Sequence, residues 1–168
     1  MDIAKDVRSI DAVAARVLAA LDPGQRAAQS TRIQIVGLGV FGPPAARRRV
    51  VRTLLNRPTR SVAGGFGPEQ LELLTQTLLV ILNAVGTDLL TDLAKEQVTG
   101  WWQRRRLARV LSARSAPKGG DTLVGELPPA VAHDVAELTY RIAVRTGVGE
   151  QRARHVANLL AAELSKQP

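Results

Sequence analysis

The sequence contains no cysteine, few aromatic residues and only two histidines, His133 and His155. The absence of cysteine excludes disulfides, thiol catalysis and thiolate metal sites, and two imidazoles offer little for a histidine-rich metal centre. Aromatic side chains make up 3% of the residues, so the core must be built from small and aliphatic side chains. That composition favours packed helices over β-sandwiches. These absences disfavour most enzyme chemistries and leave binding open.

Enough apolar material is present for a folded core. Hydrophobic residues make up 45% of the 168 residues, a length that suits one domain or one domain with an appended helical hairpin. The first 22 residues carry four aspartates where a secretory signal needs a basic start and an apolar run, so we expect a cytoplasmic protein. The preference for arginine over lysine is typical of GC-rich bacterial genomes.

The net charge of +8 is unevenly distributed. Two basic bands, residues 43–60 and 101–118, contain six basic residues each and no acid, while 68–96 contains five acids and one lysine. Like charges packed this densely repel, so each band should face solvent or an anionic partner. The two readings left open are solvated helix faces and an anion-binding surface.

Apolar residues recur at three- and four-residue steps in several segments, which predicts amphipathic helices. We expect one helix over 2–22, ended by Pro23-Gly24, and a basic helix over 45–56 with its apolar side inward. Residues 128–168 should form an antiparallel helical hairpin with Gly147 in the left-handed cap conformation.

The domain organisation follows from this pattern. Residues 1–114 would form a helical core domain, and the proline- and glycine-rich segment 115–127 a linker to the hairpin.

The broadest apolar pattern begins at Pro68 and continues to about residue 98. A narrow polar line interrupts it, formed by Glu69, Glu72, Gln76, Asn83 and Thr87. Such a helix is a central core helix, an oligomer seam or a membrane span. Asp88 and Asp92 would be costly in lipid, so we favour a core helix wrapped by the rest of the chain. The residues that we expect to be among the least exposed are Leu78, Leu82, Val85 and Leu89.

Residues 32–36 alternate between polar and β-branched side chains and are the best strand candidate. The glycines at 37, 39 and 42 follow in the pattern G-x-G-x-x-G. This motif resembles the dinucleotide fingerprint of Rossmann domains, which implies a phosphate at the N-terminus of the next helix. The usual acidic residue is missing, because Arg57 and Arg60 occupy its region, and no later strands complete a parallel sheet. The alternative is a glycine-rich turn between strand and helix.

The same stretch is similar to the bacterial histone-like DNA-binding family, in which an apolar strand, a V-G-x-G-x-F turn and an arginine-rich arm follow one another. The residues that match the turn are Val36, Gly37, Gly39 and Phe41. Arg47, Arg49 and Arg52 would fall in the arm, and Pro58 near its tip. The resemblance implies DNA binding. The helical hairpin that should precede the strand comes last in this chain.

Trp101-Trp102 followed by Arg104-Arg105-Arg106 is a second cluster suited to binding. Indoles stack on exposed bases and arginines pair with phosphates. The same residue types also suit a lipid headgroup interface or a protein interface. The alternative is one tryptophan in the core beside solvated arginines.

We therefore predict a mainly α, compact bundle of five to six helices, with at most one short strand or hairpin near 32–41 and a C-terminal helical hairpin. Its leading function is nucleic-acid binding through phosphate contacts, without enzyme activity, cofactor or metal. The predicted contact residues are Arg47, Arg48, Arg49, Arg52, Arg57, Arg60, Trp101, Trp102, Arg104, Arg105, Arg106, Arg109 and Arg114.

Two other functions stay open. One is a structural or adaptor protein that oligomerises, or that binds a partner or a membrane surface, through the apolar helix 68–98; its basic bands would then meet an acidic partner or a membrane surface. The other is a nucleotide-binding protein that uses the glycine motif at 37–42.

Overall fold

The computed structural model describes residues 8–56, 67–86 and 119–165, and most of these residues are helical. The elements are α1 (Ile10–Leu21), the short 3-10 helix η2 (Pro23–Gln25), α2 (Arg26–Val40), α3 (Pro44–Asn56), α4 (Pro68–Gly86), α7 (Pro129–Arg145) and α8 (Glu150–Leu164). These segments contain no strand; a single isolated bridge joins Ser9 to Leu123. The predicted mainly α bundle is confirmed.

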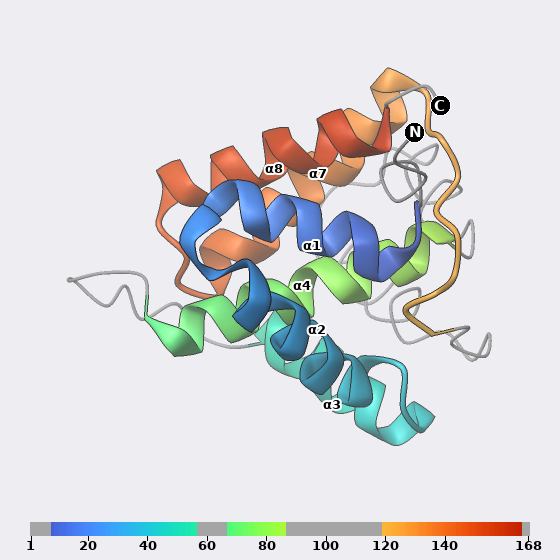
Figure 1. Ribbon diagram of the computed structural model, residues 1–168, viewed down its shortest axis with the longest axis vertical. Coiled ribbons are helices and arrows are strands. Elements are labelled where there is room, and N and C mark those ends of the chain that lie inside the picture. Colours follow the sequence, from blue (N-terminus) through green and yellow to red (C-terminus); the bar gives the residue numbers. More distant parts are fainter. Residues whose placement is uncertain (1–7, 57–66, 87–118, 166–168) are drawn as a thin grey trace.

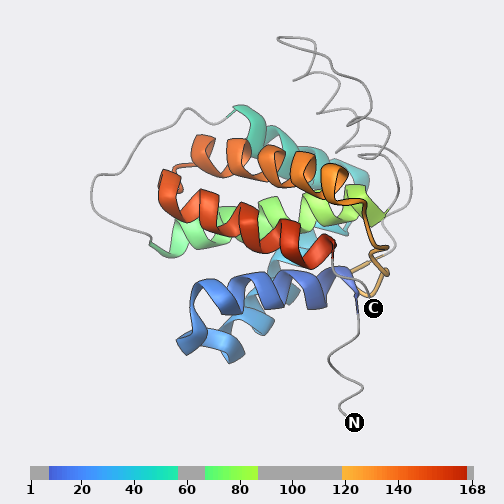
Figure 2. The same cartoon turned by 90° about the horizontal axis from the view of Figure 1, so that it is seen from above.

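Helix α4 is the centre of the bundle (Figure 1). Helices α1, α2, α3 and α7 pack against it, and Figure 2 shows α8 between α7 and α1. Leu78 and Leu82 have no exposed surface and Val85 is also buried, as predicted, while Leu89 lies outside the described residues. Asn83, predicted on the polar line, is buried instead. No helix among the described segments has the length and apolar character needed to cross a bilayer.

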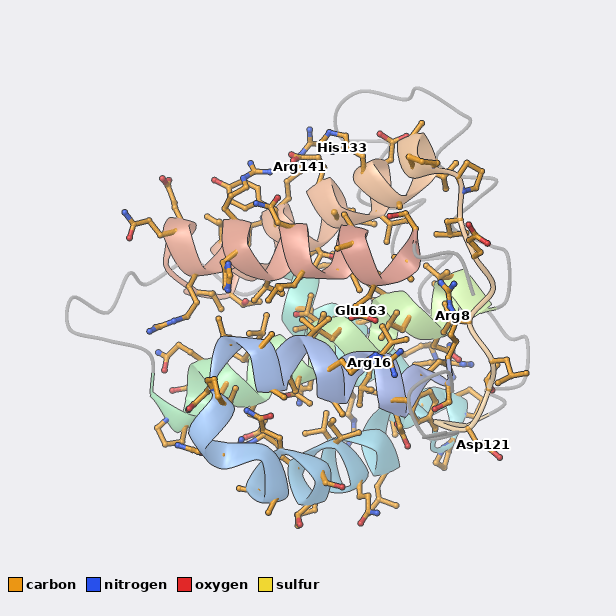
Figure 3. All side chains as sticks on the ribbon, turned by 45° about the horizontal axis from the view of Figure 1, so that its top comes forward. Arg8, Arg16, Asp121, His133, Arg141 and Glu163 are labelled. Atoms are coloured by element: carbon orange, nitrogen blue, oxygen red, sulfur yellow. The ribbon has the colours of Figure 1, made fainter. Side chains whose placement is uncertain are left out.

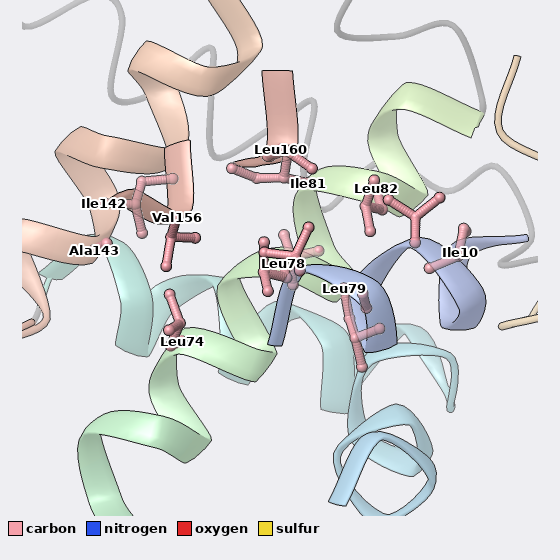
Figure 4. Packing of buried hydrophobic residues seen from close by; sticks show 14 of the residues in the cluster. Ile10, Leu74, Leu78, Leu79, Ile81, Leu82, Ile142, Ala143, Val156 and Leu160 are labelled. Carbon is pink, nitrogen blue, oxygen red and sulfur yellow. The ribbon is translucent and has the colours of Figure 1, made fainter. Parts of the chain in front are cut away.

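The core around α4 is aliphatic. Figure 4 shows Leu82 of α4 beside Ile10 of α1, and Leu78 further along α4 toward Val156 and Leu160 of α8. All five of these side chains are 0% exposed. Burial of one such side chain stabilises the fold by about 1.5–3 kcal/mol relative to leaving it exposed.

Helix α1 begins later than the sequence pattern predicts. Ser9 caps it, because the Ser9 Oγ accepts a hydrogen bond from the Ala12 N–H at 3.2 Å. The backbone just before the helix is extended and paired: the Val124 N–H donates to the Arg8 carbonyl oxygen at 2.6 Å. The predicted helix over 2–22 is therefore wrong at Arg8 and Ser9, and residues 2–7 lie outside the described part of the chain.

Helix α2 replaces the predicted strand at 32–36. The alternation of that segment is real, but Ile33, Val36 and Val40 also recur at helical steps, and all three are buried. Burial of this face against α1 and α4 outweighs the β propensity of isoleucine and valine. The polar residues just before this segment belong to the same helix, which begins at Arg26.

Gln29 joins α2 to the end of α1. Its side chain is 1% exposed, and its Nε2 donates to the carbonyl oxygens of Leu18 at 3.0 Å and Asp22 at 3.2 Å. Each of these carbonyls also accepts a backbone N–H, Leu18 from Asp22 at 3.0 Å and Asp22 from Gln25 at 3.3 Å. The Gln29 amide therefore adds a second hydrogen bond to each carbonyl at the end of α1 and fixes how α2 leaves α1.

Helices α7 and α8 form the predicted hairpin. Gly147 has φ 91°, and the Val148 N–H donates to the Ala143 carbonyl oxygen at 3.0 Å, which closes the end of α7. The hairpin packs on α1 and α4 and its apolar residues join the same hydrophobic cluster. Residues 119–127 of the predicted linker are not helical. The division into two domains stays a prediction.

Candidate nucleic-acid interface on helix α3

Helix α3 forms as predicted for the basic segment 45–56. Pro44 opens it, and a proline fits the first turn because the N–H groups there have no intrahelical acceptor. Val51, Leu54 and Leu55 are buried and hold the helix against α4 and its neighbours. The inner face is thus apolar, and the opposite face is free to carry charge.

That opposite face carries a row of exposed arginines, Arg48, Arg49 and Arg52. Helical spacing places them on one side, because residues three and four apart are neighbours on a helix surface. Within the row, the Arg48 Nε donates a hydrogen bond to the Pro44 carbonyl oxygen at 3.4 Å. We call these three residues the arginine row.

No acidic residue accompanies the arginine row along the chain. Helix α3 contains none, and none occurs anywhere in the sequence from Pro23 to Pro68. Arg48 and Arg52 are one turn apart, an arrangement of like charges that destabilises a helix by about 0.2–0.5 kcal/mol. An anion bound along the row would offset this repulsion.

Arg47 does not belong to this surface, which corrects the sequence prediction. Its side chain is 1% exposed, because it lies on the same side of α3 as Val51 and Leu54, four and seven residues further on. Burial lowers the pKa of the Arg47 guanidinium from its ordinary value. Arg47 is therefore a buried structural residue and is not available to a polyanion.

The other predicted contact residues lie outside the described residues: Arg57, Arg60, Trp101, Trp102, Arg104, Arg105, Arg106, Arg109 and Arg114. They stay predictions. The described segments contain twelve arginines and ten acids, so they carry +2 of the net charge of +8. Most of the net positive charge is thus in the remaining segments.

The glycine motif is not a turn between a strand and a helix. Gly37 and Gly39 lie inside α2, and the chain turns only after Val40, at 41–43. Gly39 faces α3, since a Cβ on it would meet the Val50 side chain at 3.6 Å. A dinucleotide fingerprint requires a strand before its glycines, so the Rossmann-like context is absent from this part of the fold. The strand and arm of the histone-like family are likewise replaced by helices α2 and α3.

Several other arginines hold the fold together (Figure 3). Arg8 donates through Nη2 to the carbonyl oxygens of Glu163 at 3.1 Å and Leu164 at 3.0 Å, which caps the end of α8. The Arg16 Nε contacts the Glu163 carboxylate at 2.9 Å. These guanidinium groups join separate elements of the fold.

The described residues contain no group of three or more potential metal ligands. Both histidines are exposed, on α7 and α8, and Glu137 is paired with Arg154. The sequence reasoning missed a different feature, the exposed apolar side chains of Ile35 and Leu38 on α2. A helix over 26–40 would have placed these two side chains on the side opposite the buried residues. The predicted strand at 32–36 did not lead to that expectation.

Comparison of the chain with protein-family models, with curated proteins and with solved structures gave no match. A functional assignment therefore depends on the residues and contacts of the chain itself.

Proposed function

We propose that the protein binds nucleic acid through the phosphate backbone, with Arg48, Arg49 and Arg52 of α3 as contacts. The observation that carries the proposal is an exposed arginine row on a helix without any acid. A guanidinium group presents paired donors that match the oxygens of a phosphate, so three in a row suit a repeating anion. Backbone contacts of this kind position a protein without reading sequence.

The predicted second band extends the same proposal. Arg104, Arg105 and Arg106 would add phosphate contacts, and Trp101 and Trp102 would stack on exposed bases. We also propose that the protein is bacterial and cytoplasmic, because nucleic acid is accessible in that compartment.

The test is a titration of labelled duplex DNA at several salt concentrations, followed by fluorescence anisotropy. Affinity should fall steeply with salt, and each phosphate contact removed should reduce the log–log slope by about 0.9. The double variant Arg48→Gln/Arg52→Gln should therefore show a clearly shallower slope. The matched control is Arg141→Gln/Arg152→Gln, two exposed arginines on the C-terminal hairpin, where acids are interspersed.

Equal loss in the two double variants would assign the binding to net charge and not to α3. Binding that does not change with salt, or no binding at low salt, would remove nucleic acid as the partner.

The two other functions have less support on the described residues. The apolar residues of α4 from Leu71 to Val85 are buried within the chain, so this part of the predicted seam is not open to a partner, and residues 87–98 lie outside the described residues. The nucleotide-binding alternative loses the strand that its glycines require. One observation still supports an interaction surface. Ile35 and Leu38 are exposed, and they lie on α2 and not on the predicted seam at 68–98.

A further inference from the structure

Helix α2 has an exposed face that neither the core nor the arginine row uses. Ile35 is 64% exposed and Leu38 is 77% exposed; the one other large apolar side chain so exposed among the described residues is Leu123. Helical spacing groups further exposed residues with this pair: Ala27, Ala28, Thr31 and Gln34. None of these six residues is charged. We call them the α2 face.

Side-chain size on the α2 face increases along the helix. Its first part, at 27–31, carries small side chains, and its last part carries Ile35 and Leu38. If two copies of α2 pair in antiparallel orientation about a twofold axis, the large residues of each copy meet the small residues of the other. Such an arrangement is isologous and self-complementary, with ridges of one helix in the grooves of its partner.

We propose that the α2 face binds a second copy of this chain. An anionic lipid surface or an acidic protein would be selected by charge, and this face has none. The arginine row that could attract such partners lies on the neighbouring helix. The graded order of side chains instead selects its own copy in reverse orientation.

The size of the face sets the strength of the contact. Fifteen residues of helix extend about 22 Å, so the buried area is well below the roughly 800 Å² per partner of a standard stable interface. We therefore expect a weak dimer whose population depends on protein concentration.

The dimer gives the arginine row a function that it lacks alone, and this consequence rests on the proposed function. Three arginines are few phosphate contacts for stable binding at moderate salt. Because Gly39 of α2 packs against Val50 of α3, each row lies one helix away from the dimer seam. Two rows on one polyanion raise the effective concentration of each for the other, so duplex DNA should in turn favour the dimer.

The experiment is sedimentation equilibrium over a series of protein concentrations, with and without a short duplex. The mass should rise from 18.0 kDa toward twice that value as concentration increases. The variant Ile35→Gln/Leu38→Gln, which changes exposed side chains only, should stay monomeric with an unchanged circular dichroism spectrum. Leu123→Gln removes an equally exposed apolar side chain away from α2 and should dimerise as the unmodified chain does.

Three outcomes decide the proposal separately from the proposed function. If Arg48→Gln/Arg52→Gln loses duplex binding and still dimerises, the dimer stands whichever anion the row binds. A mass of 18.0 kDa at every concentration without duplex, and one chain per bound duplex in its presence, overturns the dimer even if duplex binding persists. If the unmodified chain stays monomeric but sediments with vesicles of anionic lipid, and the α2 variant does not, the occupant of the face is a membrane surface and the second copy is excluded.

Discussion

The two pairs of consecutive helices in this fold use charge in opposite ways. Helices α7 and α8 contain four arginines and four acids, and Arg154 of one helix pairs with Glu137 of the other while stacking 3.8 Å above the Tyr140 ring. Helices α2 and α3 contain six arginines and no acid. In the C-terminal pair, an ion pair joins the helices. In the α2–α3 pair, Gly39 packs beside Val50, and Arg48, Arg49 and Arg52 are exposed. Charge that does not serve folding is the better indicator of a binding surface.

The same two pairs also turn differently. Gly147, between α7 and α8, has φ 91°, a conformation that side chains disfavour. Gly42, between α2 and α3, has an ordinary backbone conformation, but a Cβ on it would collide with the Leu38 carbonyl oxygen. One connection depends on the conformational freedom of glycine and the other on its small size.

The largest expected effect comes from a change in α4, the helix against which both pairs pack. Leu82 of α4 is 0% exposed at the centre of the bundle, and Leu82→Ala should lower the free energy of unfolding by about 2–5 kcal/mol through lost burial and a cavity. Urea denaturation should show one cooperative transition. Leu123→Ala, at an exposed leucine, should stay within about 0.5 kcal/mol of the unmodified chain. Two separate transitions would show that the pairs fold independently.

A smaller effect separates the two connections. Gly147→Ala should cost about 1–2 kcal/mol, because alanine must adopt the left-handed conformation, and Gly147→Asn should cost less, since asparagine tolerates it better. Gly42→Ala should cost about 1–3 kcal/mol through crowding, and Gly42→Asn should bring no relief. Thermal unfolding of the four variants measures this. If asparagine destabilised the fold less than alanine at both Gly42 and Gly147, the two connections would not differ in why they need glycine.

The predictability of these features from sequence depended on periodicity. Helices α3, α7 and α8 were predicted because their apolar residues keep one period without competition. Helix α2 was not, because the alternation at 32–36 fits a strand as well as Ile33, Val36 and Val40 fit a helix. Only packing against α1 and α4 decides between the two periods.

The candidate site was predictable to a similar extent. Arg48, Arg49 and Arg52 are exposed as the acid-free band predicts, but Arg47 is buried. The spacing of Arg47 from Val51 and Leu54 places it on the buried side of the helix. A count of charges does not take this spacing into account. The α2 face could not be predicted, because exposure of Ile35 and Leu38 has a meaning only once α2 is known to be a helix.

The next prediction sharpens the contrast in charge. Arg52→Gln relieves the repulsion with Arg48 and should raise the free energy of unfolding by about 0.2–0.5 kcal/mol. Glu137→Gln removes the partner of Arg154 and should lower it. Both differences should shrink in high salt, because both are electrostatic and near the surface. Denaturation at two salt concentrations measures them, and changes of the same sign would mean that the two pairs do not differ in their use of charge.

The smallest expected effect concerns Asp11, a carboxylate near residues 119–124 that destabilises the fold when it is ionised. The Asp11 carboxylate lies against Gly120, and burial, with a smaller effect of the nearby Asp121 charge, raises the pKa of Asp11 above its ordinary value. A raised pKa in the folded state means that the folded chain holds the proton more tightly than the unfolded chain does. The resulting stability is fully present below the unfolded pKa and is lost as pH rises through the folded pKa.

Ionised Asp11 therefore destabilises the fold at neutral pH, although an acid in the first turn of a helix is usually favourable. Asp11→Asn should raise the free energy of unfolding at neutral pH and flatten its dependence on pH in the acid range. Asp121→Asn should give an intermediate profile, because it removes the repulsion and leaves the burial. Denaturation profiles across the acid range measure this, and identical profiles for the unmodified chain and Asp11→Asn would show that the burial of this carboxylate does not affect stability.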